Sequence, residues 1–261
     1  MSIRLGAVSY LNTRPLVYGL ESQTDRFNLR FDVPAQCAAL LHANDVDLGL
    51  IPSIEYVGHD YRIVPGVSIA SEGPVASVTL FSKVPRMDIR SVALDTSSRT
   101  SQALLRILCA RRFTVQPRFV SMPPDLTAML TACDAALVIG DNALFADPGA
   151  PGLEKVDLGE EWSGMTGLPF VYAFWAGRPG VAGPEDIAAL QEARDRGLGA
   201  TAAIARQAYP ESAARAARAD RYLREDVKYA LGDREKQGLT RFYELAADIG
   251  IVAAAPAPRF Y

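Results

Sequence analysis

The chain has 261 residues, of which 49% are hydrophobic and 22% are charged, a balance typical of a globular protein with one or two compact domains. Its 27 basic and 30 acidic side chains give a net charge of −3, so it lacks the broad positive field that holds nucleic acid, and we expect no nucleic-acid partner. It has no uninterrupted apolar segment of about 20 residues and no signal-peptide pattern at its start, so we expect no membrane association and a cytoplasmic location.

The first part of the chain alternates short β-branched runs with helical stretches, a pattern that predicts βαβ units and a parallel sheet. The expected elements are strand 3–8, helix 15–20, strand 29–33, helix 35–43, strand 48–51 and short strands at 62–64 and 67–70. A longer apolar strand at 75–81 follows, and we interpret it as a crossing into a second lobe.

A second alternating series begins at residue 91. Its expected elements are strand 91–94, helix 101–113, strand 116–120, helix 124–132, strand 135–139, helix 142–145 and a second long apolar strand at 169–176. Beyond Gly183 and Pro184 the pattern is helical, with expected helices at 185–196, 200–208, 211–218, 224–231 and 233–249. These helices need a sheet face to cover, and we expect it to be that of the first lobe.

The predicted fold class is therefore α/β, with two lobes joined by two crossing hinge strands and followed by a helical C-terminal tail. We assign residues 1–84 and 177–261 to lobe 1 and residues 85–176 to lobe 2. Such a hinged clamshell binds a small molecule in its cleft, but the fold alone does not specify an enzyme. The three cysteines, Cys37, Cys109 and Cys133, lie far apart in mostly apolar surroundings, so we expect buried thiols rather than disulfides.

The most informative segment is the turn Ser97-Ser98-Arg99-Thr100-Ser101, which leaves an apolar strand and enters a helix. Helix N-termini carry unpaired N–H groups and partial positive charge, and hydroxyl side chains add further donors, so this turn predicts a site for a carboxylate or phosphate. The alternative is an ordinary serine N-cap. Four hydroxyl side chains exceed what one cap needs, which favours a binding site.

Several familiar catalytic patterns are missing. His42 and His59 are the only histidines, and neither has metal-ligand spacing; there is no G-x-S-x-G elbow, phosphate-binding loop or G-x-G-x-x-G turn. We therefore expect no metal and no nucleotide cofactor, so that any catalysis is cofactor-free.

Other polar loops stand where cleft-facing loops of a clamshell belong. Residues 9–14 leave the first strand, and their alternative role is a helix-entry turn closed by Pro15. Ser77 is either a cleft residue or a half-buried serine bonded to backbone. Asp141 follows Ile139 and Gly140 at a strand end and is alternatively a helix N-cap. Residues 166–169 enter the second hinge strand, where glycine and proline can serve only the backbone.

Taken together, these segments resemble the chorismate dehydratases of the futalosine route to menaquinone. The matching segments are SYLNTRPL at 9–16, DLGLIPSIEY at 47–56, GPVASVTLFS at 73–82, LDTSSRTSQALLRIL at 94–108, CDAALVIGDNAL at 133–144 and DLGEEWSGMTGLPFVYAFWA at 157–176. They occur in the family's order over about residues 3–178, and their combination is far more specific than any single one. The helical tail matches in character only.

The resemblance implies a type II periplasmic-binding-protein-like fold and removal of water from chorismate to give 3-[(1-carboxyvinyl)oxy]benzoate. It implies a catalytic role for Asn12, matches Ser77 to the serine of the crossing strand, and matches residues 97–101 to the turn that binds the substrate carboxylate. Chorismate is a dianion, so we expect neutral donors together with Arg14 to hold it. The implied catalytic residue is Asn12, and the candidate substrate-binding residues are Ser9, Arg14, Ser77, Ser97, Ser98, Arg99, Thr100, Ser101, Ile139, Gly140, Asp141 and Thr166.

Since no histidine and no cleft carboxylate beyond Glu55 or Asp141 is available as a base, we hypothesise that the enolpyruvyl carboxylate of the substrate takes the proton while Asn12 positions the leaving hydroxyl. The alternatives are a non-catalytic carboxylate-binding protein of the same fold, the related enzyme that makes 1,4-dihydroxy-6-naphthoate, and a regulatory effector-binding module. The second is disfavoured because residues 60–261 lack the mid-chain histidine expected of it, and the third because no helix-turn-helix precedes the first strand. The expected partner is chorismate.

Overall fold

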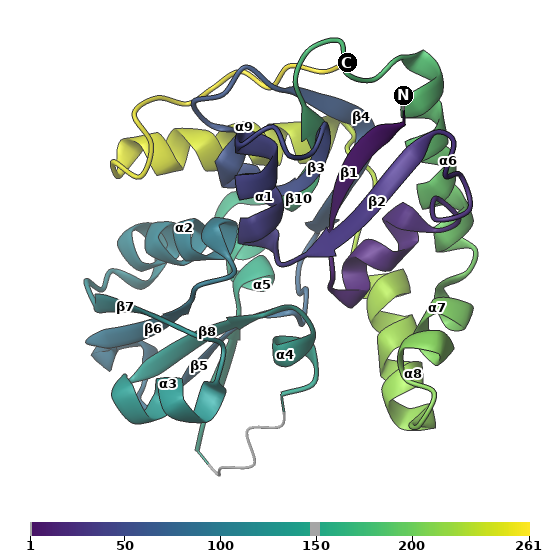
Figure 1. Cartoon of the computed structure of the whole chain (residues 1–261). Helices are drawn as coiled ribbons and strands as arrows, with labels where there is room; N and C mark the ends of the chain where they lie inside the picture. Colours follow the sequence, from purple (N-terminus) through teal and green to yellow (C-terminus); the bar gives the residue numbers. More distant parts are fainter. Residues whose placement is uncertain (1, 147–151) are drawn as a thin grey trace.

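The computed structural model describes residues 2–146 and 152–261 and contains two five-stranded sheets, each with helices packed around it (Figure 1). The first sheet has the strand order β2-β1-β3-β10-β4 and the second the order β7-β6-β8-β5-β9. The strands are β1 Ile3–Val8, β2 Phe27–Asp32, β3 Leu48–Pro52, β4 Arg62–Ser71, β5 Val78–Ser82, β6 Ser91–Asp95, β7 Arg118–Met122, β8 Ala135–Ile139, β9 Glu154–Asp157 and β10 Phe170–Gly177.

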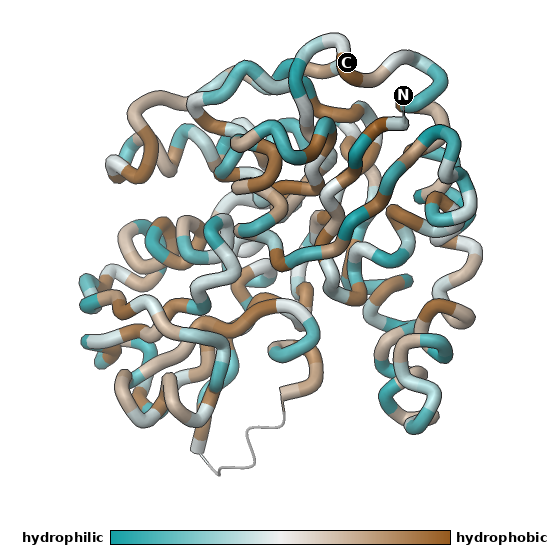
Figure 2. Tube along the Cα trace, in the orientation of Figure 1, coloured by the Kyte–Doolittle hydropathy of each residue, from teal (hydrophilic) through white to brown (hydrophobic). Residues whose placement is uncertain are grey.

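Both sheets contain a parallel part, as the alternating pattern predicts, and an antiparallel part. In the first sheet β1 runs parallel to β2 and β3, whereas β10 is antiparallel to β3 and β4. In the second, β6 is parallel to β7 and β8, whereas β5 is antiparallel to β8 and β9. The central strand β8 is apolar and buried throughout, whereas the outer strand β2 mixes polar and apolar residues, a contrast visible in Figure 2.

Each of the two long apolar strands lies in the lobe opposite to the one we assigned. We placed the strand ending at Ser82 in lobe 1, but β5 lies in the second sheet; we closed lobe 2 with 169–176, but β10 lies in the first sheet. A continuous apolar run indicates a buried strand without indicating which sheet buries it. The chain therefore passes between the sheets in the segments 72–77 and 167–169, and we propose these segments as the lobe boundaries.

The helical elements are the 3₁₀ helices η1 Leu11–Val17, η2 Ser53–Tyr56 and η3 Arg86–Asp88, the π-helical segments η4 Cys109–Phe113 and η5 Tyr222–Asp226, and the α-helices α1 Pro34–His42, α2 Arg99–Leu108, α3 Leu126–Ala132, α4 Gly140–Leu144, α5 Leu158–Thr166, α6 Pro184–Leu198, α7 Thr201–Ala208, α8 Ala213–Arg221 and α9 Asp233–Asp248. Strand β9 and helix α5 were not predicted. The expected helix 15–20 is wrong, because residues 11–17 form a 3₁₀ helix and Gly19, with φ +77°, is in the left-handed region, which ends a helix before residue 20.

The C-terminal tail returns to the first lobe, as its helical pattern predicts: α6 packs on η1 and β4, and α9 packs on β10. The expected helix 224–231 is wrong. After η5 the chain extends along the edge strand β4, where Ala70 and Lys228 exchange two backbone hydrogen bonds of 2.8 Å. Pairing with an open sheet edge satisfies these backbone groups in place of a helix.

The interior is apolar and closely packed. Trp162, Trp175 and Phe174 are fully buried, and all three cysteines are buried and free, as predicted. Among the helices of residues 2–146 and 152–261, none combines the length and apolarity needed to span a membrane.

Candidate active site

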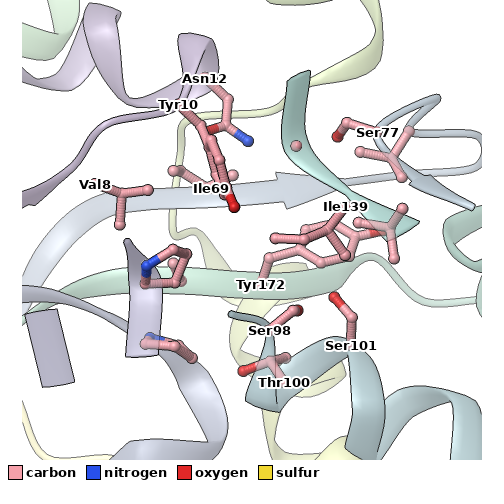
Figure 3. Close-up of a pocket in the computed structure, with 16 residues that line it drawn as sticks. Val8, Tyr10, Asn12, Ile69, Ser77, Ser98, Thr100, Ser101, Ile139 and Tyr172 are labelled. Atoms are coloured by element: carbon pink, nitrogen blue, oxygen red, sulfur yellow. The ribbon is translucent and has the colours of Figure 1, made fainter. Parts of the chain in front are cut away.

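A cavity opens between the two sheets, at the ends of several strands and beside both segments that pass between the lobes (Figure 3). It holds about 540 Å³, its open mouth included. No charged side chain of the described residues lines it. The lining residues are Val8, Tyr10, Asn12, Pro34, Pro52, Ile69, Val75, Ser77, Val78, Ser98, Thr100, Ser101, Ile139, Gly140, Tyr172 and Ala173.

The polar groups of the cavity lie on opposite sides of it. Asn12 enters from η1, after β1, whereas Ser98, Thr100 and Ser101 enter from the start of α2 on the other side, with apolar side chains such as Ile139 between them (Figure 3). An elongated ligand with polar groups at both ends and an apolar middle fits such a cavity.

The N-terminus of α2 supplies the donors on one side. Helix α2 begins at Arg99, two residues earlier than predicted, so Ser98 is its N-cap. Among the residues that the structure describes, no side chain caps α2, and its first-turn N–H groups have no side-chain acceptor there. Because Thr100 and Ser101 of this turn line the cavity, a carboxylate bound there meets N–H groups, hydroxyls and the positive end of the helix dipole.

Tyr10 and Ser97 join the two lobes at the rim of the cavity. Ser97 donates through its Oγ to Asp95 Oδ1 at 2.6 Å, so its oxygen is left to accept the hydroxyl of Tyr10 at 3.1 Å. Burial raises the pKa of Asp95, against the two bonds that Ser97 donates to it. A second link runs from the backbone N–H of Leu11 to Asp141 Oδ1 at 3.1 Å. These two hydrogen bonds link the two lobes directly in this structure.

Asn12 is part of a buried chain of hydrogen bonds. Its Nδ2 donates to the hydroxyl of Tyr222 at 3.1 Å, and that hydroxyl donates to Ser77 Oγ at 2.8 Å. Tyr222 belongs to the C-terminal tail and is almost fully buried, and burial raises its pKa well above the usual range of tyrosine. The two cavity residues that the resemblance singles out are thus held by one hydroxyl from a third segment.

Asp157 fixes the segment that carries Ser77. Its carboxylate caps α5 by accepting from Gly159 and Glu160 N–H and also accepts from Val75 N–H at 3.0 Å and Ala76 N–H at 2.6 Å. Ala76 has φ +61°, a conformation that costs free energy for a residue with a Cβ and that these bonds hold in place. Burial raises the pKa of Asp157.

We expect Asp157→Ala to lower the free energy of unfolding by about 1–3 kcal/mol, because several buried N–H groups lose their acceptor. It should also lower turnover by about tenfold, since Ser77 loses its fixed position. The control is Asp125→Ala, which removes another N-cap, that of α3, outside the cavity. Thermal unfolding and kinetics of both variants test this; equal loss of turnover in the two would contradict it.

Several predicted site residues line the cavity: Asn12, Ser77, Ser98, Thr100, Ser101, Ile139 and Gly140. Ser97 and Asp141 do not line the cavity, but each takes part in a hydrogen bond that links the two lobes. Ser9, Arg14, Arg99 and Thr166 do not line it.

Those four residues have other contacts. Ser9 is exposed, and the guanidinium of Arg14 lies 4.8 Å from the ring centroid of Phe31. Arg99 turns outward and places one nitrogen 3.0 Å from both carboxylate oxygens of Glu55, and Thr166 donates to the carbonyl of Trp162 within α5. Arg14 is thus not a lining residue, and its role in holding a substrate carboxylate stays a prediction.

Sequence analysis missed three tyrosines at the site, Tyr10, Tyr172 and Tyr222. Tyr10 stands within the quoted segment 9–16, so its position beside Asn12 was the available signal. Tyr172 lies in β10, and its hydroxyl is 3.0 Å from Ser71 Oγ. Nothing in the spacing of the tail indicated that Tyr222 contacts Asn12 and Ser77 of the cavity.

The fold and the cavity define a two-lobed protein with a cavity between its two sheets. A protein of Archaeoglobus fulgidus has the same fold, with a TM-score of 0.76 and 19% identity over 96% of this chain and 98% of that one. A conserved gene product of Candida albicans, described as exhibiting the generic periplasmic binding protein structural fold, has a TM-score of 0.62 and 10% identity over 98% of this chain and 92% of its own. The chain thus has the predicted periplasmic-binding-protein fold.

The sequence comparisons identify the family. A family described as menaquinone biosynthesis matches residues 3–248. The chorismate dehydratase of Thermus thermophilus is 33% identical over 258 residues, which cover 92% of this chain and 93% of that protein. The chain belongs to this menaquinone biosynthesis family, as the motifs predict.

Proposed function

We propose that the protein is a hydro-lyase that removes water from chorismate to give 3-[(1-carboxyvinyl)oxy]benzoate, without a cofactor, in the cytoplasmic futalosine route to menaquinone. The similarity to the Thermus thermophilus enzyme supports the reaction. The observation that carries the proposal is the pairing, across one cavity, of Asn12 and Ser77 with the uncapped N-terminus of α2. This arrangement supplies donors for a carboxylate on one side and for a leaving hydroxyl on the other.

The chemistry follows from these positions. A substrate carboxylate at the start of α2 is bound by first-turn N–H groups and by the hydroxyls of Ser98 and Ser101, at no cost of a buried cation. Asn12 then donates to the ring hydroxyl as its C–O bond breaks. The C–H electrons form the new ring double bond, and the enolpyruvyl carboxylate takes the proton. The carboxylate then passes this proton to the departing hydroxyl, which leaves as water, and the carboxylate is regenerated. Aromatisation of the ring makes the step downhill.

One assay tests the proposal. Purified protein is incubated with chorismate, and loss of the diene absorbance is followed together with the aromatic product by chromatography. We expect stoichiometric conversion without added metal or nucleotide. Binding of chorismate without turnover would instead indicate a carboxylate-binding protein, and neither binding nor turnover would contradict both.

Substitution of Ser101 tests the placement of the carboxylate. Ser101 is buried at the start of α2 and lines the cavity. We expect Ser101→Asp to raise KM for chorismate by about a hundredfold, because a second carboxylate then faces the anionic substrate in a poorly solvated site. Ser101→Asn is the matched control, since it has the same shape without the charge. Similar KM values for the two variants would argue that no substrate carboxylate lies there.

A further inference from the structure

We infer that Tyr222 is a positioning residue for catalysis: its hydroxyl orients the Asn12 amide and the Ser77 hydroxyl toward the substrate. This inference rests on the proposed function, because it concerns the reacting geometry of that site. It begins from the hydrogen-bond chain in which Asn12 Nδ2 donates to Tyr222 and Tyr222 donates to Ser77, at 3.1 and 2.8 Å.

The direction of these bonds determines what the cavity presents. Because Tyr222 accepts from Asn12, the Nδ2 end of the amide points to the tyrosine, and within the described residues this is the only hydrogen bond of that side chain. The Oδ1 atom and the second N–H remain for a ligand. Without Tyr222 the amide is free to rotate by half a turn, which exchanges donor and acceptor at the reacting hydroxyl.

Tyr222 also orients the hydroxyl of Ser77. Its Oγ accepts from Tyr222, and its own proton has no acceptor in the part of the chain that the structure describes. Ser77 lines the cavity, so its hydroxyl is set as a donor toward the ligand. The Tyr222 hydroxyl therefore determines which atoms of Asn12 and Ser77 donate and which accept. These two residues come from distant segments, η1 and the crossing segment 72–77.

Tyr222 is itself rigidly placed. It is 2% exposed and opens the π-helical segment η5, whose last turn closes with a bond from Val227 N–H to the Tyr222 carbonyl at 3.1 Å. The next residues pair with β4 through Ala70 and Lys228. A side chain that must hold another in a reactive orientation needs such support, and π-helical turns are often found at functional sites.

The test compares Tyr222→Phe with Tyr229→Phe. Tyr229 lies in the same tail and is also buried, but its hydroxyl has no hydrogen-bond partner among the described residues, so its loss removes the same atom without removing a bond. We expect Tyr222→Phe to lower kcat by about tenfold to a hundredfold with KM changed by less than about threefold, and Tyr229→Phe to leave both unchanged.

A double-mutant cycle separates positioning from general stability. Once Asn12 and Ser77 are both replaced by alanine, Tyr222→Phe should lower the residual rate by less than about twofold, because no group remains for it to orient. A further tenfold loss in that background would overturn the inference. So would equal kcat values for Tyr222→Phe and Tyr229→Phe in a wild-type background that converts chorismate, whereas inactive wild-type protein would contradict the proposed function instead.

A measurement without a variant at 222 covers the case in which Tyr222→Phe does not fold. The chain has only four asparagines, so the side-chain amide signals of Asn12 are assigned in ¹⁵N-labelled protein by their loss in Asn12→Ala. We expect one Asn12 amide proton to exchange slowly with solvent, as a proton donated to a buried acceptor does. Fast exchange of both protons would show that Tyr222 does not hold the amide.

Discussion

Asn12→Ala is expected to lower kcat for chorismate dehydration by about a hundredfold to a thousandfold, the usual cost of removing a donor aimed at developing negative charge. Asn12 is the cavity residue whose amide has both a fixed partner, Tyr222, and free groups facing the ligand. KM should change much less than kcat, because the substrate is bound mainly through the carboxylate at the start of α2. Steady-state kinetics measure the two parameters separately.

Two further variants make this prediction specific. Asn28→Ala is the control, because Asn28 is exposed on β2 and outside the cavity, and it should retain full activity. Asn12→Asp introduces a carboxylate beside the leaving group and should be slow and newly pH-dependent. Full turnover by Asn12→Asp with an unchanged pH profile would mean that Asn12 does not assist departure of the hydroxyl.

Gly140→Ala is expected to lower kcat/KM by about a hundredfold, because the added methyl group collides with Tyr10, which links the two lobes. A Cβ at this position would lie 2.9 Å from two ring carbons of Tyr10, closer than carbon atoms approach without displacement. Displacing Tyr10 breaks its bond to Ser97 and shifts the turn that carries Asn12. A misplacement of about 1 Å is enough for a loss of this size.

The positive φ of Gly140, +62°, adds a backbone cost that must be separated from the collision. Gly180→Ala provides the comparison: Gly180 has φ +81°, and a Cβ there would meet nothing within 4 Å. Both variants should lose about 1–2 kcal/mol of stability, which thermal unfolding measures, but only Gly140→Ala should lose activity. Equal kcat/KM values for the two variants would mean that activity does not depend on the contact between Tyr10 and Gly140.

The parts of this fold that the sequence predicts are those governed by local pattern. The strands 3–8 and 135–139 were predicted with the bounds that the structure has, because short apolar runs between polar turns specify strands. The hydroxyl-rich entrance to α2 was recognised because helix N-termini have a local signature. Assignment of β5 and β10 to their sheets was wrong because pairing partners depend on the whole chain.

The site was predicted where it depends on strand ends and missed where it depends on side-chain direction. Thr166 was expected in the cleft, but a threonine near a helix C-terminus commonly bonds to the carbonyl one turn back, as it does here. Arg14 was expected to meet the substrate, but in this structure its long side chain lies over Phe31. Tyr222 was missed because a turn from helix to sheet edge, without any periodicity, brings it to Asn12.

The origin of Tyr222 in the tail has a consequence for how the protein is made. Synthesis proceeds from the N-terminus, so a nascent chain possesses every strand of both sheets before the tyrosine that orients Asn12 has emerged. A partly synthesised chain can therefore have the strands that form the cleft and still lack the residue that orients Asn12. The site is complete only when the tail has been synthesised and pairs with β4.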